Sequence, residues 1–128
     1  MIGNKAVALF GNLIPHAELL QDAQGIALES DAGGFTPRGF SLDMDESKRI
    51  KVMQWKKHFH NYGVYEFSAG GSGSDINDLK EIGTALAGLS PDSQRYFDLH
   101  HAETDTFEAV SKRELDLGAV NMAAFHQY

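Results

Sequence analysis

The sequence predicts one α+β domain over residues 1–128, built from a small mixed sheet of three or four strands and three to four helices, with a mainly helical C-terminal half. Three observations carry this expectation. Short apolar or alternating runs in the first half are typical of strands. Residues 75–115 instead repeat apolar side chains every three or four positions behind good helix caps. The length of 128 residues and the hydrophobic content of 42% suit a single core better than two.

The first half of the chain begins with strand-like and loop-like segments. Residues 5–10 form a compact apolar run that closes at a Gly-Asn pair, which predicts a strand and a turn. Residues 16–28 leave two interpretations open, a helix or a helix that gives way to a strand. The segment 31–39 (DAGGFTPRG) is expected to be a surface loop. Residues 40–44 alternate apolar and polar side chains, which predicts a half-buried strand.

The middle of the chain is more ambiguous. Residues 45–61 open with acids and then become basic, the order that complements a helix dipole, so we expect a helix. The alternative is a hairpin in which residues 49–55 return against residues 40–44. Residues 62–68 (YGVYEFS) are rich in aromatic and β-branched side chains and predict a strand. The tract 69–74 (AGGSGS) lacks the Lys-Ser or Lys-Thr pair of a phosphate-binding loop and is expected to be a flexible linker.

The C-terminal half favours helices. An amphipathic helix is expected over residues 75–89, because its large apolar residues fall on one helical face. These residues are Ile76, Leu79, Ile82, Leu86 and Leu89. The sequence Ser-Pro-Asp at 90–92 is typical of a helix start and predicts a second helix over 91–101. A third helix is expected over 106–115, and the tail 119–128 is left unassigned.

Charge and cysteine content limit the functional classes. The net charge is -7, from 18 acidic and 11 basic residues, and this field repels nucleic acid and anionic membranes while attracting basic proteins. We therefore expect no membrane binding and no direct contact with nucleic acid, although residues 48–57 form a short basic segment. The absence of cysteine excludes disulfides and thiolate chemistry, and the cytoplasm is the expected location.

Histidine pairs are the candidates for metal chemistry. His58 and His60 are two residues apart, and His100-His101 precede Glu103. On a helix these spacings do not bring two side chains together, because helical neighbours lie three or four residues apart. We therefore expect no catalytic residue, no metal site and no cofactor.

The carboxylates of the C-terminal half form a stronger pattern. On successive helices, acids of this kind can imitate the phosphate array of a DNA duplex and bind a basic nucleic-acid-binding protein. The predicted partner-binding residues are Asp75, Asp78, Glu81, Asp92, Asp98, Glu103, Asp105 and Glu108. Helix capping and solvation explain several of these acids one by one but less easily the whole set.

Residues 40–115 resemble the antirestriction proteins of the ArdA type. The resemblance rests on the segments MDESKRIKVMQWKKHF, NYGVYEF and INDLKEIGTALAGLSPDSQRYFDLHHAETDTFEAV. It implies a non-enzymatic DNA mimic, carried by a phage or mobile element, that inhibits a host defence protein of the restriction or CRISPR type. The basic segment 48–57 departs from that family, whose members are also usually longer and more acidic.

Two alternatives remain beside the antirestriction hypothesis. An immunity protein that neutralises a toxin nuclease would use the same charge complementarity. A metalloenzyme that depends on histidine and carboxylate ligands is the third hypothesis, of a different class. A homodimer is compatible with each of them.

Overall fold

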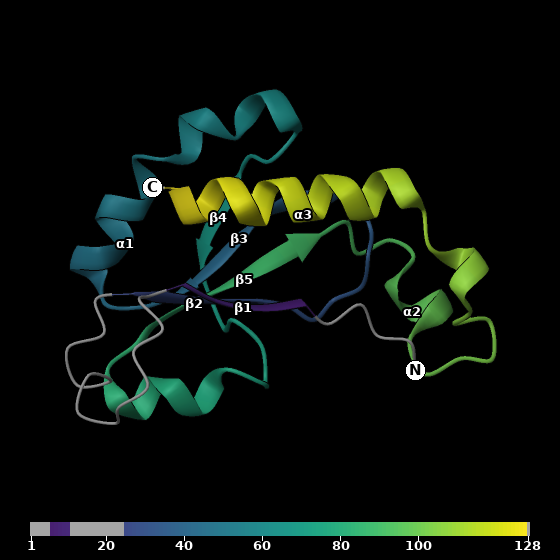
Figure 1. The fold of residues 1–128 in the computed structure, drawn as a ribbon, viewed down its shortest axis with the longest axis horizontal. Coiled ribbons are helices and arrows are strands. Elements are labelled where there is room, and N and C mark those ends of the chain that lie inside the picture. Colours follow the sequence, from purple (N-terminus) through teal and green to yellow (C-terminus); the bar gives the residue numbers. More distant parts are fainter. Residues whose placement is uncertain (1–5, 11–24, 128) are drawn as a thin grey trace.

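A computed structural model describes residues 6–10 and 25–127. Its centre is a five-stranded mixed sheet with the order β1-β2-β5-β3-β4 (Figure 1). The strands are β1 (Ala6–Phe10), β2 (Ile26–Ser30), β3 (Pro37–Asp43), β4 (Glu66–Ala69) and β5 (Ala85–Pro91). The β2–β5 and β3–β4 pairs are parallel, whereas β1–β2 and β3–β5 are antiparallel. The α+β class is confirmed, with one strand more than expected.

In residues 25–127, three α-helices and four short 3-10 helices accompany the sheet. The α-helices are α1 (Glu46–Met53), α2 (Tyr96–Leu99) and α3 (Lys112–Gln127). The 3-10 helices are η2 (Lys56–His58), η3 (His60–Tyr62), η4 (Asn77–Ile82) and η5 (Phe107–Ala109). Helix α3 lies across one face of the sheet, and η4 lies on the opposite side (Figure 1). None of the helices in the described part of the chain is long and apolar enough to cross a membrane.

Successive strand residues point to opposite sides of the sheet, and an apolar cluster covers each side. On the α3 side, fully buried Phe40 packs against three other rings, with centroid distances of 5.5 Å to Phe59, 5.5 Å to Phe67 and 4.5 Å to Phe125. On the other side, a smaller apolar cluster joins Ala27, Ile76 and Leu86. The aromatic cluster is therefore the main core, and α3 closes it.

The expected helix over 75–89 is wrong. Only residues 77–82 are helical, as the 3-10 helix η4, and Gly83 ends it with a φ of 83°. Residues 85–91 form β5, the central strand, in which five consecutive residues from Ala85 to Leu89 are buried. A strand buried on both faces is a continuous apolar run, so its pattern does not alternate. The spacing of Leu86 and Leu89 matched a helix only by coincidence.

Other predicted elements were shifted or shortened. The helix over 45–61 is confirmed for residues 46–53, with the Asp45 side chain accepting a 2.9 Å hydrogen bond from the Lys48 backbone N–H, and the hairpin alternative is wrong. The second helix shrinks to the four residues of α2, and the unassigned tail belongs to α3, the longest helix described. In the segment 16–28, residues 26–28 belong to strand β2, and residues 16–24 lie outside the described part.

The glycine-serine tract is packed rather than free. We call residues 70–76 the strap, because this segment crosses the sheet face opposite α3. Ser41 on β3 donates a 2.8 Å hydrogen bond to the Gly71 carbonyl, and an added Cβ on Gly88 of β5 would lie 2.3 Å from the Ser72 carbonyl oxygen. Only glycine fits where two backbones approach this closely. The expectation of a flexible linker is therefore wrong.

Candidate functional site

The carboxyl ends of β2 and β5 lie at the same edge of the sheet, because the two strands are parallel. Asp31 follows β2, and Asp92 follows β5 and leads into α2 and the two histidines. In Figure 1, β5 points toward the end of the molecule that carries α2 and η5. Ligands of open α/β sheets characteristically bind outside the carboxyl ends of the strands. This edge is therefore the candidate functional site.

His100 and His101 lie side by side on a turn directly after α2, in the segment that follows β5. Their ring centroids are 4.0 Å apart, and the Tyr96 ring stacks on His100 at 4.7 Å. His101 has a φ of 56°, and it is the only non-glycine residue with positive φ in the described part of the chain. Such a conformation is uncommon and often marks a functional position. The helical-spacing argument against this pair fails, because α2 ends at Leu99.

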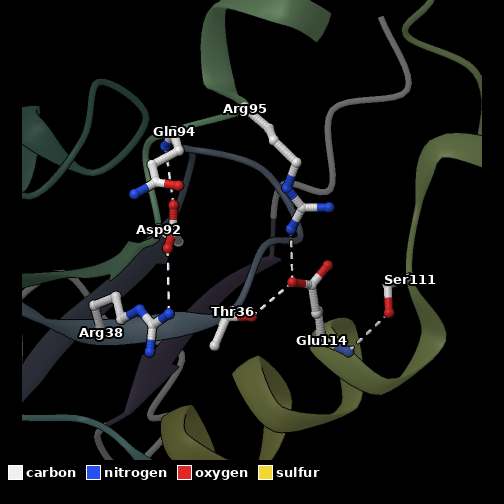
Figure 2. A network of polar contacts seen from close by, with 7 residues as sticks. All are labelled: Thr36, Arg38, Asp92, Gln94, Arg95, Ser111 and Glu114. Atoms are coloured by element: carbon white, nitrogen blue, oxygen red, sulfur yellow. Dashed lines mark hydrogen bonds and ion pairs between the residues drawn. The ribbon is translucent and has the colours of Figure 1, made fainter.

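A polar network attaches the start of this segment to the sheet (Figure 2). The Asp92 carboxylate accepts a 2.9 Å hydrogen bond from the Gln94 backbone N–H and a 3.2 Å bond from Arg38. The Asp92 backbone N–H donates to the Thr36 carbonyl at 2.7 Å. The Gln94 N–H and the Arg38 guanidinium hold the pKa of the Asp92 carboxyl below its usual value. Asp92 is therefore a structural anchor, and its side chain is already bound within the chain.

Glu114, in the first turn of α3, forms the second part of the network. One of its oxygens accepts hydrogen bonds from Thr36 and from Arg95, both at 2.6 Å. Partial burial raises the pKa of Glu114, but the bonds from Thr36 and Arg95 outweigh this and leave the pKa below its usual value. The Arg95 guanidinium also lies 4.9 Å from the centroid of the Phe35 ring. Glu114 thus stays ionised between two donors.

Glu29 is a fully buried carboxylate on β2, two residues before Asp31. Its oxygens accept hydrogen bonds from the backbone N–H groups of Asp75 and Ile76, at 3.2 and 3.3 Å. A buried carboxylate needs such partners, because an uncompensated one is costly. Gly73, with a φ of 138°, passes so close that an added Cβ would meet the Glu29 carboxylate at 2.3 Å. Glu29 therefore fastens the strap to the strand that leads to Asp31.

The eight predicted partner-binding acids are distributed over three parts of the fold. Asp75, Asp78 and Glu81 belong to the strap and η4, which lie far from α2 and η5 in Figure 1. Asp92 is held in the anchoring network. Asp98, Glu103, Asp105 and Glu108 lie in the segment from α2 to η5. Whether any of them binds a basic protein, and whether the chain forms a homodimer, stay predictions.

Metal binding is limited by the number of donors. In the part of the chain that the structure describes, no three His, Asp or Glu side chains gather in a geometry that could hold an ion. His58 and His60 lie in η2 and η3, and the His60 ring is 5.0 Å from that of Tyr65. The described residues therefore do not fit a complete metal centre.

Comparison with known proteins changes the functional interpretation. No protein-family model matches the chain. Human carboxypeptidase Q is 28% identical over 94 residues, which cover 73% of this chain and 20% of that protein. Carboxypeptidase Q of Xenopus laevis is 32% identical over 84 residues, which cover 63% of this chain and 17% of that protein. The structure of a peptidase M28 precursor from Shewanella amazonensis superimposes with a TM-score of 0.70 at 27% identity, covering 79% of this chain and 23% of that one.

The relatives are peptidases. This finding overturns the resemblance to antirestriction proteins, the hypothesis of a non-enzymatic DNA mimic and the expectation of an anti-defence role. The alternative of a histidine- and carboxylate-dependent enzyme agrees better with these relatives. The chain spans about a fifth of the length of the curated relatives it matches.

Several residues of the candidate site had no place in the sequence-based prediction. Asp31 was assigned to a plain surface loop, Thr36 and Arg95 were not singled out, and Glu114 was not among the eight predicted partner-binding acids. A usable signal for Asp31 is the apolar run 26–28 followed by two carboxylates, Glu29 and Asp31, separated by one residue. The Arg95–Glu114 pair has no comparable signal, since its members are 19 residues apart and meet only in the fold.

Proposed function

We propose that this chain forms one wall of the active site of a peptidase-type hydrolase, located at the carboxyl edge of β2 and β5. The observation that carries the proposal is the peptidase M28 likeness, which covers 79% of the chain. It is supported by the path of the chain, which runs from the end of β5 through α2 to His101 with its positive φ. Asp31 and His101 are the candidate functional side chains. The cytoplasm remains the proposed location, since a chain without cysteine is compatible with a reducing compartment.

Histidine and carboxylate groups supply what peptide hydrolysis requires. The reaction needs a base for the attacking water and an acid for the leaving amine. An imidazole exchanges protons near neutral pH and can also be a metal ligand. Because the described residues do not form a complete metal centre, we derive no metal-dependent step.

The test transfers this chain into a related enzyme. Residues 25–127 would replace the matching segment of the Shewanella amazonensis peptidase, and hydrolysis of small peptides would be measured by release of free amine. We expect an active chimera in which His101→Ala lowers kcat/KM by about 100-fold or more, the usual effect of losing a proton-transfer group. His60→Ala is the matched control, because this exposed histidine lies in η3, outside the carboxyl edge.

Folding of each chimera would be verified by circular dichroism and thermal unfolding. A folded chimera without peptidase activity would contradict the proposal. Equal activity of the His101→Ala and His60→Ala chimeras would contradict the role of His101.

A further inference from the structure

Residues 95–114 leave the sheet and return to it as one long excursion. The excursion carries α2, the His100-His101 turn and η5. Its largest apolar side chains are not buried, since Phe97 is 83% and Phe107 is 71% exposed. A hydrogen bond of 2.8 Å from the Thr104 hydroxyl to the Asp98 carbonyl stabilises its tip from within. Hydrophobic packing therefore contributes little to holding the excursion in place.

The two ends of the excursion are joined by a charged contact. Arg95 at its start donates a 2.6 Å hydrogen bond to Glu114 at its end. Glu114 is the less exposed partner, with 17% of its side chain accessible against 50% for Arg95. Half-exposed ion pairs are screened by solvent and salt, so this contact alone would be weak.

Two further contacts fix the ion pair to the sheet (Figure 2). The Thr36 hydroxyl donates to the same Glu114 oxygen at 2.6 Å, and Thr36 directly precedes β3. The Arg95 guanidinium lies over the ring of Phe35, which is buried. A guanidinium held over an aromatic face and paired with a carboxylate loses less freedom when it binds than a free side chain would. The pair is thus attached to two neighbouring residues, Phe35 and Thr36, that lead directly into β3.

We propose that Arg95, Glu114 and Thr36 form a clasp that positions the His100-His101 turn for the reaction. The proposal rests on the proposed function, because it gives the clasp a role in the chemistry at that turn. The clasp closes the excursion at its base, and closing a loop removes most of the conformations open to its tip. No contact between the clasp and either imidazole is needed, so its members are positioning residues.

The first test measures local opening in the full chain. Amide hydrogen exchange would be compared for the wild type, Arg95→Met, which keeps an apolar side chain over Phe35, and Glu114→Gln, which keeps an acceptor for Thr36. We expect exchange of the amides of residues 96–106 to rise about tenfold in Arg95→Met and less in Glu114→Gln, as local opening becomes easier. The amides of β5 should keep their protection.

Asp116→Asn is the matched control. It removes the exposed Lys112–Asp116 ion pair in the same first turns of α3 but leaves the clasp intact. Exchange of residues 96–106 should equal that of the wild type. If Arg95→Met and Asp116→Asn give the same exchange rates in this segment, the clasp does not hold the excursion.

The second test uses the chimeric peptidase. Arg95→Met should lower kcat about tenfold or more with little change in KM, because misplacing a reacting group costs rate. Arg95→Lys, which keeps the charge, should restore part of the loss, and Asp116→Asn should match the wild type. An active chimera that depends on His101 but not on Arg95 would overturn the clasp proposal alone. A chimera that is indifferent to His101→Ala would overturn the role of His101, and a folded chimera without peptidase activity would overturn the proposed function.

Discussion

Replacing Gly88 with alanine tests the packing of the strap on the central strand. The new Cβ would lie 2.3 Å from the Ser72 carbonyl oxygen and 2.9 Å from the Ser41 hydroxyl, whereas an ordinary contact begins at 3.4 Å. The strap would have to retreat by about 1 Å in a close-packed interior. It cannot do so freely, because Gly71 is bonded to Ser41 and the amides of residues 75 and 76 are bonded to Glu29.

The expected cost of Gly88→Ala follows from overpacking. Forcing an extra methyl group into a well-packed site typically costs about 1–3 kcal/mol. For a domain of this size that corresponds to a decrease in Tm of roughly 4–10 °C. Thermal unfolding followed by circular dichroism would measure it. Gly71→Ala is the control in the strap itself, since no atom lies within 4 Å of its added Cβ, and its Tm should not fall. Equal Tm values for the two variants would refute the proposed packing of the strap.

Three further predictions can be tested by measuring the unfolding of single variants. Phe40→Ala should lower the free energy of unfolding by about 3–5 kcal/mol, because the buried ring contacts three others. A smaller decrease than that caused by Tyr65→Ala, which truncates an exposed ring, would contradict this. Glu29→Ala should cost about 2–4 kcal/mol, since two backbone amides lose their acceptor, and Glu29→Gln should cost less. The pKa of Glu114 is lowered in the folded chain, so its contribution is present at neutral pH and is lost as the pH falls below about 4.5. Tm of Glu114→Gln should therefore decline less steeply than that of the wild type below that pH.

Local patterns were reliable where one face of an element meets the core and the other meets solvent. The alternation of Phe40 and Leu42 with polar neighbours identified β3, and the acids before the bases identified α1. The patterns failed for β5, where both faces are buried and small residues such as Ala87 and Gly88 have weak strand propensity. The packing that makes this segment a strand comes from β2, β3 and the strap, which local sequence does not specify.

The candidate site was less predictable than the fold. The histidine pair was noticed, but the argument against it assumed that α2 continued through His101. The partnership of Arg95 with Glu114, and of both with Thr36, depends on the strand order that brings residues 36, 95 and 114 to one edge. Such contacts between distant parts of the sequence become visible only once the topology is known.

The position of β5 has a consequence for synthesis of the chain. In the described part of the sheet, the β1–β2 pair and the β3–β4 pair are joined only through β5, which is made after all four of them. Isolated two-stranded pairs are at best marginally stable in water. On the ribosome, the first 84 residues therefore expose two unfinished sheet edges until residues 85–91 emerge. A translational pause before residue 85 should prolong that exposure and the need for a chaperone.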